Sequence, residues 1–221
     1  MGGTIKKFTS QGNDVKIVIM ATGIEARRSI DYKNTSNYKI PKNDSKIMKK
    51  QIKDIQVHAK KAATMLGTKQ IEFLDFPDNE MDKITNLEIT KSIEKIIELF
   101  KPDKIFTHSP YDVNIDHRLI YQATLTATRP NSKTSVDELY SFEVPSSTEW
   151  NFHTSFQPNV FVDISKTLKF KLKAMSVYKT EIKEFPHPRS LQALESIGKR
   201  WGSISGFKAA EAFCLVRQLQ K

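Results

Sequence analysis

One short stretch of this chain, HSPYDVNIDHR, gathers two histidines and two aspartates within ten residues, from His108 to His117. Imidazole nitrogens and carboxylate oxygens are the usual ligands of catalytic zinc, which takes three of them and leaves one position for water. His117 follows Asp116 at the predicted start of a helix, so its ring can face a cleft while Asp116 caps the helix or orients a neighbour. One helix histidine with nearby aspartates is an incomplete ligand set. The stretch therefore indicates either a metal and acid/base site or a polar turn, and the residues alone leave both open.

The other polar side chains of the stretch also have a functional and a structural interpretation. His108 ends a short predicted strand and is a second ligand, a substrate contact or a packed polar residue. Asp112 and Asn114 fall in a turn, where their side chains either contact a ligand or stabilise the turn itself. Arg118 is a further candidate substrate contact. Earlier in the chain, Arg27 and Arg28 follow a predicted strand and either clamp a substrate group or lie in a solvated loop.

The sequence lacks the residue patterns that other catalytic chemistries require. The sequence contains no GxSxG nucleophile elbow and no phosphate-binding glycine loop of the GxxxxGK[ST] or GxGxxG type. Its single cysteine, Cys214, lies in the apolar run AFCLV, which argues against a thiolate nucleophile. A serine or cysteine hydrolase and a P-loop enzyme are therefore not indicated.

Helical and strand patterns alternate along the chain, and these elements must position the candidate residues. Apolar residues with a period of two, or in short runs, predict strands over 15–19, 71–76, 104–107, 138–144 and 159–164. Apolar residues at helical spacing predict helices around residues 5–8 and over 46–66, 87–100, 116–128, 165–181 and 191–219, the last interrupted near 201–206. The last helix would carry Glu211 between alanines, as a paired structural carboxylate. Such alternation predicts one α/β domain with a doubly wound, mostly parallel sheet and helices on both faces.

Ligands of open α/β sheets bind outside the carboxyl ends of the strands. Three polar segments follow predicted strands in this way, at residues 21–28, 75–82 and 107–117, while residues 24–45 form a long predicted loop. The stretch that contains His117 therefore lies where a ligand is expected.

Composition narrows the class of protein further. The net charge of +10 comes mainly from lysines scattered along the chain, because only seven of the 35 basic residues are arginines. That distribution favours solvated helix faces over a nucleic-acid-binding surface, although a basic nucleic-acid-binding α/β module stays as an alternative. No apolar run is long enough to span a bilayer, and no leader peptide is visible. With a single cysteine, the chain is predicted to be cytoplasmic.

Four segments, in order, resemble the LmbE-like or PIG-L zinc-dependent de-N-acetylases. Residues 2–23 resemble the segment that follows the family's HPDDE motif, and residues 62–67 and 71–82 resemble its LG-containing helix and the next strand. Residues 107–130, THSPYDVNIDHRLIYQATLTATRP, resemble the second metal motif. Residues 186–213, from PHPRS to AEAF, resemble the closing pattern and place His187 and Arg189 near the pocket as substrate contacts.

The resemblance implies a Rossmann-like sheet and a zinc hydrolase that removes acetyl groups from N-acetylglucosamine-type sugars or related amides, as free sugars or glycoconjugates. His117 matches the histidine that closes the second metal motif, and Asp116 matches an orienting residue beside it. Asn114 occupies the position at which many relatives have a histidine that assists the transition state. Zinc would polarise the amide carbonyl and activate water.

HPDDE, which supplies two ligands and the general base in the family, does not occur in these 221 residues. We therefore expect a single deacetylase domain over 1–221 that lacks the first strand of the family's sheet and is truncated at its N-terminus, with one zinc ligand and no activity. A missing strand also predicts self-association. The alternative is a catalytically inactive relative that binds a sugar or nucleotide sugar.

Overall fold

The computed structural model of the protein describes residues 1–23 and 42–220. Arg27 and Arg28 lie outside these residues, as does most of the loop predicted over 24–45, and the last four residues of that prediction belong to a helix. The helices of the described part are α1 (Gly2–Ser10), α2 (Lys42–Leu66), α3 (Asn86–Phe100), α4 (Ile115–Ala127), α5 (Leu168–Ser176) and α6 (Leu191–Ser205). The strands are β1 (Ile17–Ala21), β2 (Ile71–Phe76), β3 (Lys104–His108), β4 (Glu138–Phe142), β5 (Val160–Asp163) and β6 (Ala210–Gln218). Two short 3₁₀ helices, η2 (Met81–Lys83) and η3 (Thr148–Trp150), lie in the connections.

Side-chain caps set where three of the helices begin. Thr85 accepts a hydrogen bond from the Glu88 amide before α3, and Asn114 accepts one from the Asp116 amide before α4. Ser190 does the same for the Ala193 amide before α6. Each cap satisfies an amide that has no partner inside its helix.

The strands of the described residues form two sheets. β1 pairs with β2 in parallel, and a second sheet has the order β3-β4-β6-β5. β3 and β4 are parallel, with His108 opposite Phe142, whereas β6 runs antiparallel to both β4 and β5. The predicted α/β class is confirmed, the prediction of one mostly parallel sheet is wrong, and the doubly wound, Rossmann-like connectivity stays a prediction.

The last strand accounts for the antiparallel pairs. Two helices, α5 and α6, connect β5 to β6, so β6 starts beside the end of β5, with Ala210 opposite Asp163. The prediction of helix through residue 219, with Glu211 on it, is therefore wrong. Alanine, glutamate and leucine favour helix, but a segment between two partner strands gains more from ladder hydrogen bonds and from burial of residues 210–213.

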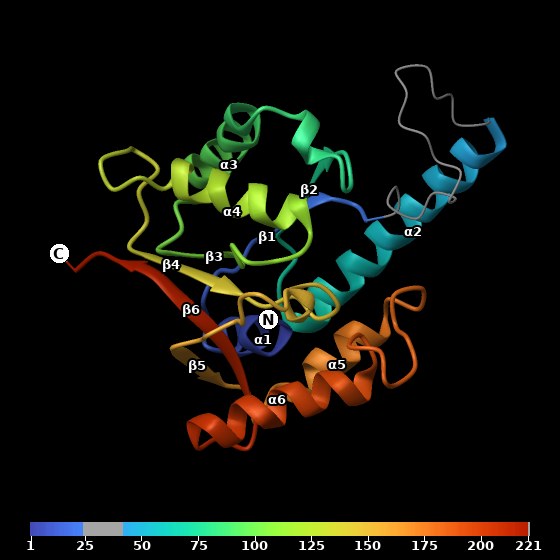
Figure 1. The fold of residues 1–221 in the computed structure, drawn as a ribbon, viewed down its shortest axis with the longest axis vertical. Helices are drawn as coiled ribbons and strands as arrows, with labels where there is room; N and C mark the ends of the chain where they lie inside the picture. Colours follow the sequence, from blue (N-terminus) through green and yellow to red (C-terminus); the bar gives the residue numbers. More distant parts are fainter. Residues whose placement is uncertain (24–41, 221) are drawn as a thin grey trace.

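Helices lie on both sides of the sheets (Figure 1). On one side α3 and α4 pack together, over a core that contains Met20, Met81, Ile89, Ile120 and Ala123. On the other side α1, α2 and α5 enclose a second core of Ile5, Ala62, Leu66 and Ala174. No helix in the described ranges is long and apolar enough to cross a membrane.

Parallel pairing fixes the place of the candidate residues. Because β3 and β4 run in the same direction, the segments that follow them leave the sheet at the same edge. The HSPYDVNIDHR stretch starts at His108, the last residue of β3, and continues into α4, while the segment after β4 carries η3.

Candidate functional site

Asp112 is the centre of the polar cluster at this edge. The residue is 1% exposed, and its Oδ1 accepts hydrogen bonds from the Ser147 hydroxyl and, at 2.9 Å, from the Asn114 amide. Its Oδ2 accepts one at 2.7 Å from the Thr148 hydroxyl. Burial by itself raises the pKa of Asp112, but the nearby His117 ring and the hydrogen bonds from the Ser147 hydroxyl and the Asn114 amide outweigh it and lower this pKa to about 2. Asp112 is therefore a buried carboxylate whose contacts favour an orienting role over substrate binding.

His117 lies between Asp112 and His108. Its Nδ1 is 3.1 Å from Asp112 Oδ2, although the ring is not aligned for a straight hydrogen bond. The His117 ring stacks on the His108 ring, with centroids 4.2 Å apart and planes 10° apart. One nitrogen of His117 thus faces a carboxylate, which leaves Nε2 as the atom that could bind a ligand.

His108 is held as a neutral ring. Burial, followed by the nearby His117, lowers the pKa of His108 to about 3. The His108 ring also contacts Phe142, at a centroid distance of 5.3 Å, and its buried Nδ1 has no hydrogen-bond partner among residues 1–23 and 42–220. His108 supports the His117 ring by stacking, and its contacts are those of a packed polar residue.

Asp116 and Asn114, the two predicted catalytic residues, both bind backbone. Asp116 Oδ2 accepts from the Asn79 amide at 2.6 Å, and Oδ1 accepts from the Met81 amide at 3.1 Å. Burial raises the pKa of Asp116, while these two amides lower it in part. Asn114 uses its side-chain oxygen to cap α4 at 2.8 Å. The structure therefore gives Asp116 the role of fixing the segment after β2, and it places the carboxylate that faces His117 at Asp112.

Arg118, a predicted substrate contact, binds its own loop. Its Nη1 donates to the carbonyl oxygens of Asp112 at 2.7 Å and Val113 at 2.9 Å. This guanidinium holds the turn around Asp112 in place.

His187 contacts Trp150 at the edge of the polar cluster, and Arg189 is hydrogen-bonded to His187. The His187 ring packs edge-on against Trp150, with centroids 6.4 Å apart, and its Nδ1 accepts from the Arg189 amide at 3.0 Å. Arg189 Nη1 forms an ion pair of 2.7 Å with Glu181. Trp150 ends the same 3₁₀ helix whose Thr148 binds Asp112, and the Trp150 side chain is 45% exposed.

Three residues of this region, Ser147, Thr148 and Trp150, were missed by reasoning from the sequence. They belong to the segment PSSTEW, which follows the fourth predicted strand. The same rule that singled out the segments after the earlier strands applies here, since polar residues after the carboxyl end of a parallel strand lie at the ligand edge.

Only part of a metal site is present in the described residues. No group of three or more histidine, cysteine, aspartate or glutamate side chains within residues 1–23 and 42–220 is arranged to hold a metal ion. His117 fits one ligand position through Nε2, with Asp112 behind it. A complete zinc centre needs two further protein ligands, so these residues do not fit zinc as a complete set.

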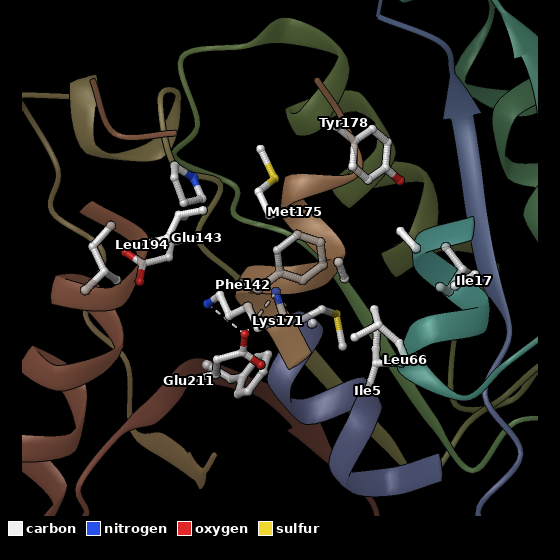
Figure 2. Close-up of a pocket in the computed structure, with 18 of the residues that line it drawn as sticks. Ile5, Ile17, Leu66, Phe142, Glu143, Lys171, Met175, Tyr178, Leu194 and Glu211 are labelled. Carbon is white, nitrogen blue, oxygen red and sulfur yellow. Dashed lines mark ion pairs between the residues drawn. The ribbon is translucent and has the colours of Figure 1, made fainter. Parts of the chain in front are cut away.

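A separate cavity of about 320 Å³ lies between α1, α2, α5, α6 and strands β1, β4 and β6. Figure 2 shows its apolar wall, which includes Ile5, Leu66 and Met175, and the charged pair of Lys171 and Glu211 at one end. None of the predicted site residues that the structure describes lines this cavity. The candidate site and this apolar cavity are therefore different places.

The site and the fold together define a class of protein. Residues 1–128, more than half of the chain, match the family described as GlcNAc-PI de-N-acetylase, or PIG-L. The chain belongs to this family, and the resemblance found in the sequence is confirmed.

Particular relatives are enzymes that remove acetyl groups. The chain is 27% identical over 223 residues to the diacetylchitobiose deacetylase of Thermococcus kodakarensis, with 98% of this chain and 77% of the relative covered. The structure of the N,N'-diacetylchitobiose deacetylase from Pyrococcus horikoshii in complex with an inhibitor has a TM-score of 0.72 and 23% identity, over 98% of this chain and 78% of that one. A zinc-inhibited form of teicoplanin deacetylase has a TM-score of 0.73 and 12% identity, over 100% of this chain and 94% of that one. The structural likeness shows a shared fold.

Proposed function

We propose that this protein acts on the acetamido group of an N-acetylglucosamine-type sugar or a related amide and removes its acetyl group. The observation that carries the proposal is the position of His117 in the first turn of α4, with Asp112 against its Nδ1, in a chain of the PIG-L family. The two diacetylchitobiose deacetylases among its relatives support the same class of substrate.

We assign roles to residues according to their contacts. His117 is the proposed zinc ligand, through Nε2, and Asp112 orients its ring. His108 holds the ring from its other face by stacking. Trp150 and His187 form the rim of the site, where they are placed to contact the sugar. Asp116 and Asn114 fix the two segments that carry these groups.

Zinc binding is expected to be weak if these residues act alone. One imidazole is a third of the usual protein ligand set of a catalytic zinc ion. The zinc concentration should be raised in steps during the assay. One structural neighbour, a teicoplanin deacetylase, has a zinc-inhibited form, so an excess of zinc can inhibit an enzyme of this fold.

The test is an assay of free amine released from N,N'-diacetylchitobiose by this chain as zinc is raised. We expect amine release by wild type that falls to background in His117→Ala. His153→Ala is the matched control, because His153 is an exposed histidine in the loop that follows η3. Equal release by wild type and His117→Ala would remove His117 from the proposed role.

Sugar binding is measured separately, by tryptophan fluorescence. The chain has two tryptophans, of which Trp201 is 7% exposed and Trp150 is 45% exposed, so a sugar at the rim should change the emission of Trp150. Trp150→Phe should abolish the change. Binding without amine release would identify a sugar-binding relative without catalysis, and absence of both would overturn the proposal.

A further inference from the structure

Two hydroxyl groups, from η3 and the residue before it, hold the carboxylate that faces His117. We propose that Ser147 and Thr148 are positioning residues, which fix Asp112 so that the proton of the His117 ring stays on Nδ1 and Nε2 is free for a ligand. This inference rests on the proposed function, because that function is what requires Nε2 of His117 to be free for a ligand. Ser147 and Thr148 lie 35 and 36 residues from Asp112 along the chain, and the inference assigns a role to both.

The Asp112 carboxylate has one acceptor position left that the His117 ring is placed to fill. Oδ1 accepts from the Ser147 hydroxyl and the Asn114 amide, and Oδ2 accepts from the Thr148 hydroxyl. A carboxylate offers about four acceptor positions, so one position on Oδ2 is left for His117 Nδ1 at 3.1 Å. An ionised carboxylate can only accept, and the ring proton is therefore required on Nδ1.

The Thr148 hydroxyl has a defined direction. Its oxygen accepts a hydrogen bond of 2.7 Å from the Val144 amide, which commits its own proton to Asp112 Oδ2. Because both residues are buried, at 8% exposure for Ser147 and 3% for Thr148, water does not replace their hydroxyls readily.

The turn that carries the two hydroxyls is itself fixed. The Ser146 and Ser147 amides donate to the two oxygens of Glu149, at 2.6 and 3.0 Å. Parallel pairing of β3 with β4 brings this turn to the loop that holds Asp112. The carboxylate is thus bound to the segment after a second strand and not only to its own loop.

The contact between Asp112 and His117 needs this support, because it is not aligned as a straight hydrogen bond. A bent contact is weaker and opens more easily than an aligned one. With the hydroxyls removed, the buried carboxylate can turn toward other donors, such as the Asn114 amide that it already binds. The ring of His117 then loses the group that selects its tautomer.

The test is NMR of the ¹⁵N-histidine-labelled chain without zinc or sugar, at a pH above the ordinary histidine pKa of about 6.5. Long-range ¹H–¹⁵N spectra report which ring nitrogen carries the proton, and the exchange of that proton with water reports how often the contact opens. In wild type we expect the proton on Nδ1. In the Ser147→Ala/Thr148→Val double variant we expect exchange to be faster by roughly tenfold or more, the effect of losing a hydrogen bond to a charged group, together with a rise of the Nε2–H form.

Matched variants separate positioning from stability. Thr148→Ser keeps the hydroxyl and should behave as wild type. Thr126→Val removes a hydroxyl of the same helix as His117 that donates to the Gln122 carbonyl, and it should change nothing. If the double variant does not fold, Ser147→Ala alone is the test, because Thr148 then still satisfies the Val144 amide.

A proton on Nε2 in wild type, or unchanged or slower exchange in the double variant, would overturn the inference. The measurement needs neither metal nor substrate. A negative deacetylase assay with the expected NMR result would therefore refute the proposed function alone, and the reverse result would refute only the positioning role.

Discussion

Glu211 is a buried carboxylate that holds the start of α1. It accepts hydrogen bonds from the Thr4 amide at 2.7 Å and the Gly3 amide at 3.2 Å, and it pairs with Lys171 at 2.8 Å. The expectation of a paired structural carboxylate agrees with these contacts, although its secondary structure was predicted wrongly. A buried pair of this kind matters most when one partner is removed, because the other charge is then left unpaired.

We therefore predict that Glu211→Gln lowers the free energy of unfolding by about 3 kcal/mol, measured by urea denaturation. The control is Glu195→Gln, which breaks an exposed pair with Lys199 one helical turn away and should change stability by less than about 0.5 kcal/mol. Equal effects of the two substitutions would contradict the structural role of Glu211.

The same residue predicts a pH dependence. Burial raises the pKa of Glu211, but Lys171, the N-terminal ammonium group and the Thr4 amide outweigh it and leave the pKa well below its usual range. A depressed pKa gives stability that is present above the unfolded value of about 4.3 and is lost as the pH falls below it. The difference in stability between wild type and Glu211→Gln should therefore shrink on acidification below about pH 4. A difference that grows there would show the opposite sign.

Asp116 gives a third prediction for a single residue. Asp116→Ala leaves the Asn79 and Met81 amides without their acceptor, and Met81 is completely buried. We expect a loss of about 2 kcal/mol and faster hydrogen exchange at these two amides. Asp82→Ala, at an exposed position of the same segment, should leave both exchange rates unchanged. Retained protection in Asp116→Ala would show that Asp116 does not fix this segment.

At the scale of elements, α6 and β6 are joined by a close turn that only a glycine allows. A Cβ atom at Gly202 would lie 2.7 Å from the Ala209 Cα and the Phe207 carbonyl oxygen, both of which are backbone atoms. At Gly198, four residues earlier in α6, the nearest atom would be the Leu168 Cδ1 at 3.4 Å. The close approach of Gly202 is what lets the chain reverse directly from helix to strand.

Alanine should therefore destabilise the protein at Gly202 but not at Gly198. We predict that Gly202→Ala lowers the free energy of unfolding by about 2 kcal/mol, which for a domain of this size lowers Tm by roughly 4–8 °C. Gly198→Ala should be neutral or stabilising by up to about 1 kcal/mol, through helix propensity. Thermal unfolding of both variants checks the contrast, and a stable Gly202→Ala would mean that the turn is looser than the structure shows.

At the scale of the whole molecule, the two sheets leave strand edges available. Within the described residues the end strands of the two sheets, which are β1, β2, β3 and β5, each have a partner strand on one side only. Unpaired strand edges are sites of association between chains. The net charge of +10 opposes association, and salt screens that repulsion.

We therefore predict reversible self-association that strengthens with both protein concentration and salt. Sedimentation equilibrium at two salt concentrations measures it as a rise in average mass. A constant monomer mass under all conditions would show that these strand edges are protected.

The sequence by itself determined the family, the α/β class, most of the helices and strands, and the edge of the sheet at which the polar residues gather. Those features follow from local periodicity, helix caps and motifs, all of which lie within short stretches of chain. Only the tertiary structure decided that residues 210–218 form a strand, that Asp112 and not Asp116 faces His117, and that Ser147 and Thr148 hold Asp112. Each of these depends on what the folded chain brings together, because strand pairing and buried hydrogen bonds are chosen by contacts in space and not by the neighbours of a residue along the chain.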